Sequence, residues 1–193
     1  MYKIVITGGP CAGKTTLMGI LGATLAERGI QTYMVEECAT EILAQGLTPD
    51  TCGSVLAFQR HVFDRQLEKE QALDTLDDAT VVLLDRGLMD NAGYLPDDEL
   101  DMLLAERGMT REDAYARYDA VIHLVTAAIG AEQFFSHATN EHRLEGVDEA
   151  VRVDHALMAG WAGHPNLRVI DNEGTFDDKL QRAVAAVLEV LGL

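Results

Sequence analysis

Ile4-Val5-Ile6-Thr7-Gly8-Gly9-Pro10-Cys11-Ala12-Gly13-Lys14-Thr15-Thr16 is the stretch that decides the fold of this chain. From Gly8 to Thr15 it fits the pattern G-x-x-x-x-G-K-[ST], with a β-branched run before it and a helical run after it. In that context the backbone N–H groups of the loop and the positive end of the following helix form a concave site for phosphate groups. We therefore predict a P-loop that binds the phosphates of a nucleotide.

Each residue type in this loop suits one part of a phosphate site. Gly8 and Gly13 allow the backbone to approach the ligand closely, and Lys14 would reach the β- and γ-phosphates. The hydroxyl of Thr15 would hold Mg²⁺. The alternative, a glycine-rich turn without a ligand, fits the full pattern and its flanks poorly. The predicted nucleotide-binding residues are Gly8, Gly9, Pro10, Cys11, Ala12, Gly13, Lys14, Thr15 and Thr16.

The chain is strongly acidic. It carries 32 Asp and Glu residues against 15 Lys and Arg residues, which gives a net charge of −17. This balance excludes nucleic acid and an anionic membrane surface as general partners, because both would be repelled. The few basic residues are informative, since positive charge must be concentrated wherever a polyphosphate binds.

Length, cysteine usage and hydropathy bound the organisation of the chain. With 193 residues and 48% hydrophobic content it suits one buried core, so we expect a single nucleotide-binding domain over 1–193 with a lid at about 128–160. Cys11, Cys38 and Cys52 show no C-x-x-C spacing, which indicates a reduced, cytoplasmic protein. No apolar run approaches the roughly 18 residues of a membrane span, and Met1 leads almost directly into the first strand, so we expect neither a span nor a signal peptide.

Hydrophobic periodicity alternates between strand and helix along the whole chain. This alternation predicts an α/β fold, a P-loop NTPase three-layer sandwich with a five-stranded parallel sheet and a helical lid, and its active site at the carboxyl ends of the strands. The predicted strands are 3–7, 32–36, 81–84, 120–125 and 167–170. The predicted helices are 14–28, 39–45, 53–76, 97–106, 111–117, 147–160 and 176–191, with Phe58, Val62, Leu67 and Leu73 on the apolar side of the long one.

The third predicted strand closes on Asp85 and Arg86. A P-loop protein needs a carboxylate at this position to orient Mg²⁺ or its waters, and we expect Asp85 to serve. The alternative is a helix cap or a structural ion pair. Arg86 beside it would contact the substrate.

The second predicted strand ends in Glu36 and Glu37, near the mouth of the same cleft. A carboxylate there could accept the proton of an attacking hydroxyl group, which phosphoryl transfer to an alcohol requires. Glu37 is the preferred base and Glu36 the next candidate, while an ordinary solvated glutamate pair remains the alternative.

Two arginines between the fourth and fifth strands are candidates for a lid over the transferring phosphoryl group. Arg143 is the principal candidate and Arg152 the second, since a guanidinium there would stabilise the developing charge. Either residue could instead pair with a neighbouring glutamate on an exposed helix. On the long helix, Gln59 could face the cleft and bind substrate.

Several of these segments together resemble the AAA-domain ATP/GTP-binding proteins, a group that includes nicotinamide-riboside-kinase-like domains and the GTP-binding TRPL-translocation-defect protein. The resemblance spans nearly the whole chain and implies a P-loop nucleotide-binding fold. In it, Trp161 is expected to anchor the turn before the last strand. The segments are the loop at 6–16, Glu36 to Glu41, Leu84 to Gly87, Arg143-x-Glu145 and Trp161-x-Gly163-His164-Pro165.

A weaker similarity runs to the deoxynucleoside kinases. In that family a Glu after the second strand is the base, a Phe-Gln pair on a long helix reads the nucleobase, and an acidic-Arg pair ends the third strand. Glu37, Phe58-Gln59 and Asp85-Arg86 stand in the corresponding order here. No Pro follows the glutamate and Gly87 replaces the usual Ser, which leaves the acceptor open. Asp90 or Asn91 would then touch an acceptor sugar.

The sequence thus predicts a Mg²⁺-dependent enzyme that transfers the γ-phosphoryl group of ATP to a hydroxyl group of a nucleoside-like or similarly small metabolite. Lys14, Glu37, Asp85 and Arg143 would be its catalytic residues, with Thr15 and Asp85 organising Mg²⁺. The alternative is a regulatory GTP or ATP switch for a protein or lipid partner. No N-K-x-D guanine-reading sequence is present, although GTP stays open as the nucleotide.

Overall fold

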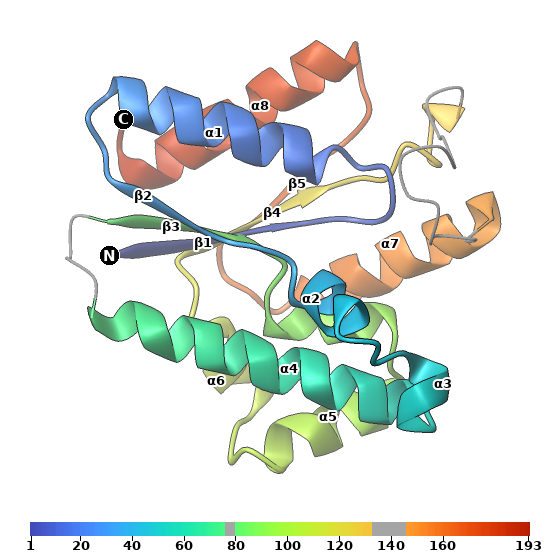
Figure 1. Cartoon of the computed structure of the whole chain (residues 1–193). Helices are drawn as coiled ribbons and strands as arrows, with labels where there is room; N and C mark the ends of the chain where they lie inside the picture. Colours follow the sequence, from blue (N-terminus) through green and yellow to red (C-terminus); the bar gives the residue numbers. More distant parts are fainter. Residues whose placement is uncertain (76–79, 133–145) are drawn as a thin grey trace.

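The core of the structure is a parallel sheet of five strands (Figure 1). The computed structural model describes residues 1–75, 80–132 and 146–193. Its strands lie in the order β2-β3-β1-β4-β5, so β1 is central. The predicted five-stranded parallel sheet is confirmed. The strands are β1 (Tyr2–Thr7), β2 (Thr32–Val35), β3 (Val81–Asp85), β4 (Ala120–Leu124) and β5 (Leu167–Ile170).

Helices cover both faces of the sheet, which gives three layers. Figure 1 shows α1 (Lys14–Glu27) and α8 (Phe176–Leu191) side by side on one face. The opposite face carries α4 (Val55–Ala72), α5 (Asp97–Ala105), α6 (Arg111–Tyr115) and α7 (Val147–Trp161). Among the described helices, none is both long and apolar enough to cross a membrane.

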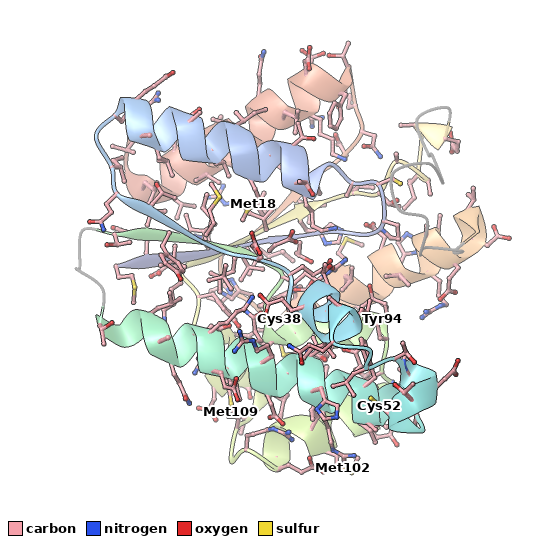
Figure 2. The ribbon with its side chains drawn as sticks, in the orientation of Figure 1. Met18, Cys38, Cys52, Tyr94, Met102 and Met109 are labelled. Atoms are coloured by element: carbon pink, nitrogen blue, oxygen red, sulfur yellow. The ribbon has the colours of Figure 1, made fainter. Side chains whose placement is uncertain are left out.

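Alternating side chains of the strands divide the core in two. Ile4 and Ile6 of β1 pack against α1 and α8, and Met18 lies on that side between α1 and the sheet (Figure 2). Val5 points to the other face, where it joins a cluster that contains Phe63 of α4 and Trp161 of α7. Because each strand is buried on both faces, its sequence reads as a continuous apolar run.

Two short elements were not predicted from the sequence, α3 (Pro49–Cys52) and η2 (Leu88–Gly93), because each is too short to show a hydrophobic period. The predicted helix 53–76 ends instead as α4 followed by the 3-10 turn η1 (Leu73–Thr75). Between β2 and α3 lies α2 (Cys38–Ala44). The long helix α4 begins two residues later than the predicted start at Gly53, because the Ser54 hydroxyl caps it by accepting a hydrogen bond of 3.0 Å from Ala57 N.

The buried face of α4 also differs from the predicted one. Phe58 and Leu73 are buried as expected, but Val62 and Leu67 are only half-buried. Phe63, Gln66 and Glu70 are buried instead. Hydrophobic period does not indicate the burial of Gln66 and Glu70, because a tertiary hydrogen-bond network decides it.

The sheet order brings the predicted site residues to one edge. In the parallel register Ile6 lies opposite Asp85, and Thr7 lies opposite His123. The carboxyl ends of β1, β3 and β4 therefore meet beside the loop at 8–13.

Candidate active site

The loop between β1 and α1 has the backbone shape that its glycines permit. Gly8 and Gly13 have φ values of 137° and 98°, and Cys11 has a φ of 56°. A side chain at Gly8 would collide with the carbonyl oxygen of Leu124. Gly13 caps α1 without a side chain, and the first turn of α1 carries no acidic residue. The N–H groups of that turn are thus available to an anion.

Lys14 lies over this loop. Its Nζ donates to the carbonyl oxygens of Gly8 at 3.0 Å and Gly9 at 3.3 Å, and its side chain is buried. Thr15 and Thr16, the next two residues of α1, are exposed. The ammonium group is therefore held at the mouth of the loop, beside the open start of the helix.

A buried carboxylate from α7 supports the loop through hydrogen bonds to backbone N–H groups. Asp154 Oδ1 accepts hydrogen bonds from Gly9 N at 2.8 Å and from Thr126 N at 3.0 Å. His123 Nε2 lies 3.3 Å from Asp154 Oδ2. Burial alone would raise the pKa of Asp154, but His123 and the two N–H donors outweigh it and lower that pKa below its usual range. Asp154 is therefore a charged support of the loop, and nothing in the sequence pattern pointed to it.

A buried lysine from α8 supports the same loop. Lys179 Nζ donates to the carbonyl oxygens of Ala12 at 3.0 Å and Val125 at 2.6 Å, and to Asn172 Oδ1 at 2.8 Å. Burial lowers the pKa of Lys179 to about 8. Its donors satisfy carbonyl groups that face the protein interior, which leaves the opposite side of the loop to present N–H groups to a ligand.

Asp85 ends β3 beside Lys14. Its Oδ1 is buried and finds no hydrogen-bond partner within the described ranges 1–75, 80–132 and 146–193. Burial raises the pKa of Asp85, while the charges of Lys14 and Arg86 oppose that shift. A desolvated carboxylate oxygen without a partner fits a hard cation such as Mg²⁺, and the Thr15 hydroxyl is a suitable second oxygen ligand.

Arg86 connects the ends of β2 and β3. Its Nε donates to Glu37 Oε1 at 2.6 Å, and its Nη1 donates to Asp90 Oδ1 at 3.1 Å. The Glu37 Oε2 atom accepts a further hydrogen bond of 2.8 Å from the Thr40 hydroxyl. Burial alone would lower the pKa of Arg86, but Tyr94 and the surrounding carboxylates raise it well above its ordinary value. Arg86 is therefore a permanent charge that places Glu37, whereas Glu36 is exposed.

Asp90 organises the segment that follows β3. Its carboxylate accepts hydrogen bonds from the Thr7 hydroxyl, from Gly87 N at 3.0 Å and from Trp161 Nε1 at 3.0 Å, besides the one from Arg86. Both oxygens are thus engaged by the protein. Asp90 acts as a support of Arg86, and the expectation that it touches an acceptor sugar is not favoured by this arrangement. Trp161 is fully buried, as an anchor should be.

Gln59 and Asn91 lie on the same side of the sheet as Arg86. Gln59 is buried on the face of α4 that also carries Gln66, whose Oε1 accepts a hydrogen bond of 3.0 Å from Cys38 Sγ. Cys38 is labelled beside α2 in Figure 2. Asn91 Nδ2 donates to Leu88 O at 2.8 Å, while its Oδ1 is buried without a partner among the described residues.

Only one of the two lid candidates falls within the described residues. Arg143 lies outside the described residues. Arg152 is exposed on α7, where its Nε and Nη2 atoms contact Glu149 at 2.7 and 2.5 Å. This i,i+3 contact is the exposed pairing that the sequence left as an alternative for Arg152.

Together these features define a P-loop protein that binds nucleotides. The chain matches the family model described as AAA domain over residues 3–179, and it belongs to that family. Family membership indicates nucleotide binding with NTP hydrolysis or phosphoryl transfer, and such domains generally bind Mg²⁺ with the nucleotide. The comparison with curated proteins finds no match. The predicted resemblance to AAA-domain proteins is thus confirmed for the family as a whole. It is not confirmed for the nicotinamide-riboside-kinase-like or TRPL-translocation-defect groups within it.

The support of the loop by Asp154 can be tested. Asp154→Ala leaves two buried N–H groups unsatisfied, so the Kd for Mg·ADP should rise about tenfold or more. Asp154→Asn keeps an acceptor oxygen and should restore most of the affinity. Titration calorimetry on the folded variants measures this. Glu70→Ala, which removes an equally buried carboxylate from α4, should lower stability without changing the Kd. Wild-type affinity in Asp154→Ala would contradict the role.

The buried charge of Asp85 gives a second prediction. Because the folded-state pKa of Asp85 is raised, ionising it costs stability above that pKa and costs nothing below the ordinary value of about 3.9. Asp85→Asn should therefore melt at a higher temperature than wild type at pH 7 without ligand, and the difference should shrink as the pH falls toward 4. The same variant should lose the Mg²⁺ dependence of nucleotide binding. A lower melting temperature at pH 7, or retained Mg²⁺ dependence, would count against this assignment.

Proposed function

We propose that the chain is a cytosolic, Mg²⁺-dependent kinase that transfers the γ-phosphoryl group of ATP to a hydroxyl group of a nucleoside-like or similarly small metabolite. The proposal refines the nucleotide chemistry that family membership indicates. It assigns Lys14 and Arg143 to charge stabilisation, Glu37 to the base, and Thr15 with Asp85 to Mg²⁺.

The observation that carries the proposal is a gathering of charged groups at the ends of β1, β2 and β3. Arg86 bonds directly to Glu37 and Asp90, and the charges of Lys14, Arg86, Glu37 and Asp90 all act on the pKa of Asp85. These five side chains comprise two cations and three carboxylates, a sum of −1. A triphosphate would be repelled by such a cluster unless Mg²⁺ adds two positive charges, which is what the metal supplies in phosphoryl transfer.

Glu37 is the base of this proposal. Its Oε1 atom pairs with Arg86, and a substrate hydroxyl would replace the Thr40 hydroxyl on its Oε2 atom. The acceptor oxygen then forms a bond to the γ-phosphorus as the bond to the bridging oxygen of ADP breaks. Glu37 receives the proton of the hydroxyl, and the products are a phosphate monoester and ADP.

The acceptor would bind against Arg86 and Gln59. The Arg86 Nη2 atom is buried without a hydrogen-bond partner among the described residues, so it is a donor whose desolvation a polar substrate would offset. Gln59 is buried on the α4 side. ATP is the preferred donor, with GTP kept as the other nucleotide, and the lid at about 128–160 would contribute Arg143.

A regulatory NTPase is the second candidate. It is favoured by the full engagement of Glu37, because a carboxylate held by both Arg86 and Thr40 can serve structure alone. Such a protein would bind or slowly hydrolyse GTP or ATP to control a protein or lipid partner, and it would need no acceptor.

Glu37→Gln separates the two candidates. In the kinase, the amide should keep ATP affinity but slow transfer by roughly 10² or more, because it cannot accept a proton. ADP release is measured with Mg·ATP and a panel of nucleosides, nicotinamide riboside and other small alcohols.

Glu36→Gln provides the matched control. Glu36 is exposed one residue away, so its amide variant should transfer phosphate at the wild-type rate. Equal rates for wild type and Glu37→Gln would move the base elsewhere, and acceptor-independent ADP release in both would favour the regulatory NTPase.

A further inference from the structure

Phe176 is an aromatic side chain that stays exposed beside the P-loop. It is the first residue of α8, and 45% of its surface is accessible. A Cβ atom built on Gly13 would lie 2.7 Å from Phe176 Cε2 and 2.9 Å from Cζ. The Cε2–Cζ edge of the ring therefore lies against the backbone of Gly13, where a side chain on residue 13 would collide with it. Nearly half of the Phe176 surface remains accessible.

Hydrogen bonds hold the segment that carries this ring in place. Thr175 and Asp178 form a capping box at the start of α8, with Thr175 N donating to Asp178 Oδ2 at 2.8 Å. Lys179, one turn along, is bonded to Ala12 O of the P-loop. Asn172 Nδ2 donates to Thr126 O and Ile129 O, both at 2.7 Å, which holds the segment before α8. Phe176 is thus carried by a rigid support rather than by a loose loop.

The sheet order determines which way a bound nucleotide runs. The groups suited to the γ-phosphate, Lys14 and Asp85, lie where β1 meets β3. The acceptor groups lie further along that side, toward β2. The α-phosphate would lie at the open start of α1, near Thr15 and Thr16. The nucleoside part of the bound nucleotide would then extend from the α-phosphate to the other side of β1, toward β4, β5 and the start of α8.

That path leads to Phe176, and we infer that its ring is the stacking surface for the base of the donor nucleotide. This inference rests on the nucleotide site of the proposed function. It adds a contact that recognises the base of the nucleotide. A purine, with two fused rings, would cover more of the exposed ring than a pyrimidine. Stacking on one rigid aromatic side chain favours a base through its π-face, so it selects a nucleotide over a bare polyphosphate.

The other exposed aromatic side chains are unsuited to this role. Within the described parts of the chain they are Tyr2 and Tyr33. Tyr2 begins β1 and Tyr33 is the second residue of β2, so both lie toward the amino ends of the strands, away from the P-loop. Tyr33 is 49% exposed, close to the value for Phe176, which makes it a matched control.

The test compares two ligands that share phosphates but differ in the base. The Kd values of Mg·ADP and Mg·tripolyphosphate are measured by calorimetry for wild type, Phe176→Ala, Phe176→Trp and Tyr33→Ala. Phe176→Ala should weaken Mg·ADP about tenfold. It should leave Mg·tripolyphosphate within about twofold of wild type. Phe176→Trp should bind Mg·ADP at least as well as wild type, and Tyr33→Ala should change neither Kd.

Two results would overturn the stacking role. Unchanged Mg·ADP affinity in Phe176→Ala would place the base elsewhere, and equal weakening of both ligands would show that the ring only shapes Gly13. If the wild-type protein binds neither Mg·ADP nor Mg·tripolyphosphate, the nucleotide site itself is refuted, and the proposed function with it. Because no acceptor is present, a failure of the kinase step cannot alter these measurements.

Discussion

A loop that points its N–H groups at an anion must find other partners for the backbone groups that face the protein. Here those partners come from three distant elements. Asp154 of α7 accepts from Gly9 N, Lys179 of α8 donates to Ala12 O, and Thr126 after β4 donates through its hydroxyl to Pro10 O. An unsatisfied buried backbone group costs about 1–3 kcal/mol, so these contacts are as necessary to the loop as its glycines.

The same helix that supports the P-loop also supports the segment that carries Arg86 and Asp90. Asp154 lies in the middle of α7, and Trp161 at its end donates to Asp90, which in turn holds Arg86. Close packing reinforces this connection, because a Cβ on Gly160 would meet the carbonyl oxygen of Met89 in η2 at 3.0 Å. The P-loop and the segment that carries Arg86 are therefore fixed relative to each other by one rigid element, as the proposed phosphoryl transfer would require.

Much of the fold could be predicted from local patterns in the sequence. The five strands, the helix after the P-loop, Asp85 at the end of β3 and Glu37 shortly after β2 follow from hydrophobic period and glycine spacing. The supports of the site do not, because Asp154 is 145 residues from Gly9 along the chain. Gln66 and Glu70 were missed for the same reason, since buried polar residues on α4 satisfy partners on other elements, such as the carbonyl of Arg86 at 3.4 Å. The strand order was not predicted either, and it is what places Phe176 beside Gly13.

The charged cluster around Lys14 and Asp85 is proposed to be a site for a metal-bound nucleotide. The direct measurement is the melting temperature of the wild-type protein with an excess of a non-hydrolysable ATP analogue, with Mg²⁺ and then with EDTA. A hundredfold excess over Kd adds about 2.7 kcal/mol of stability, which corresponds to roughly 5–10 °C for a chain of this size. We expect this rise in melting temperature with Mg²⁺ and a much smaller rise with EDTA. An unchanged melting temperature in both conditions would contradict the nucleotide site.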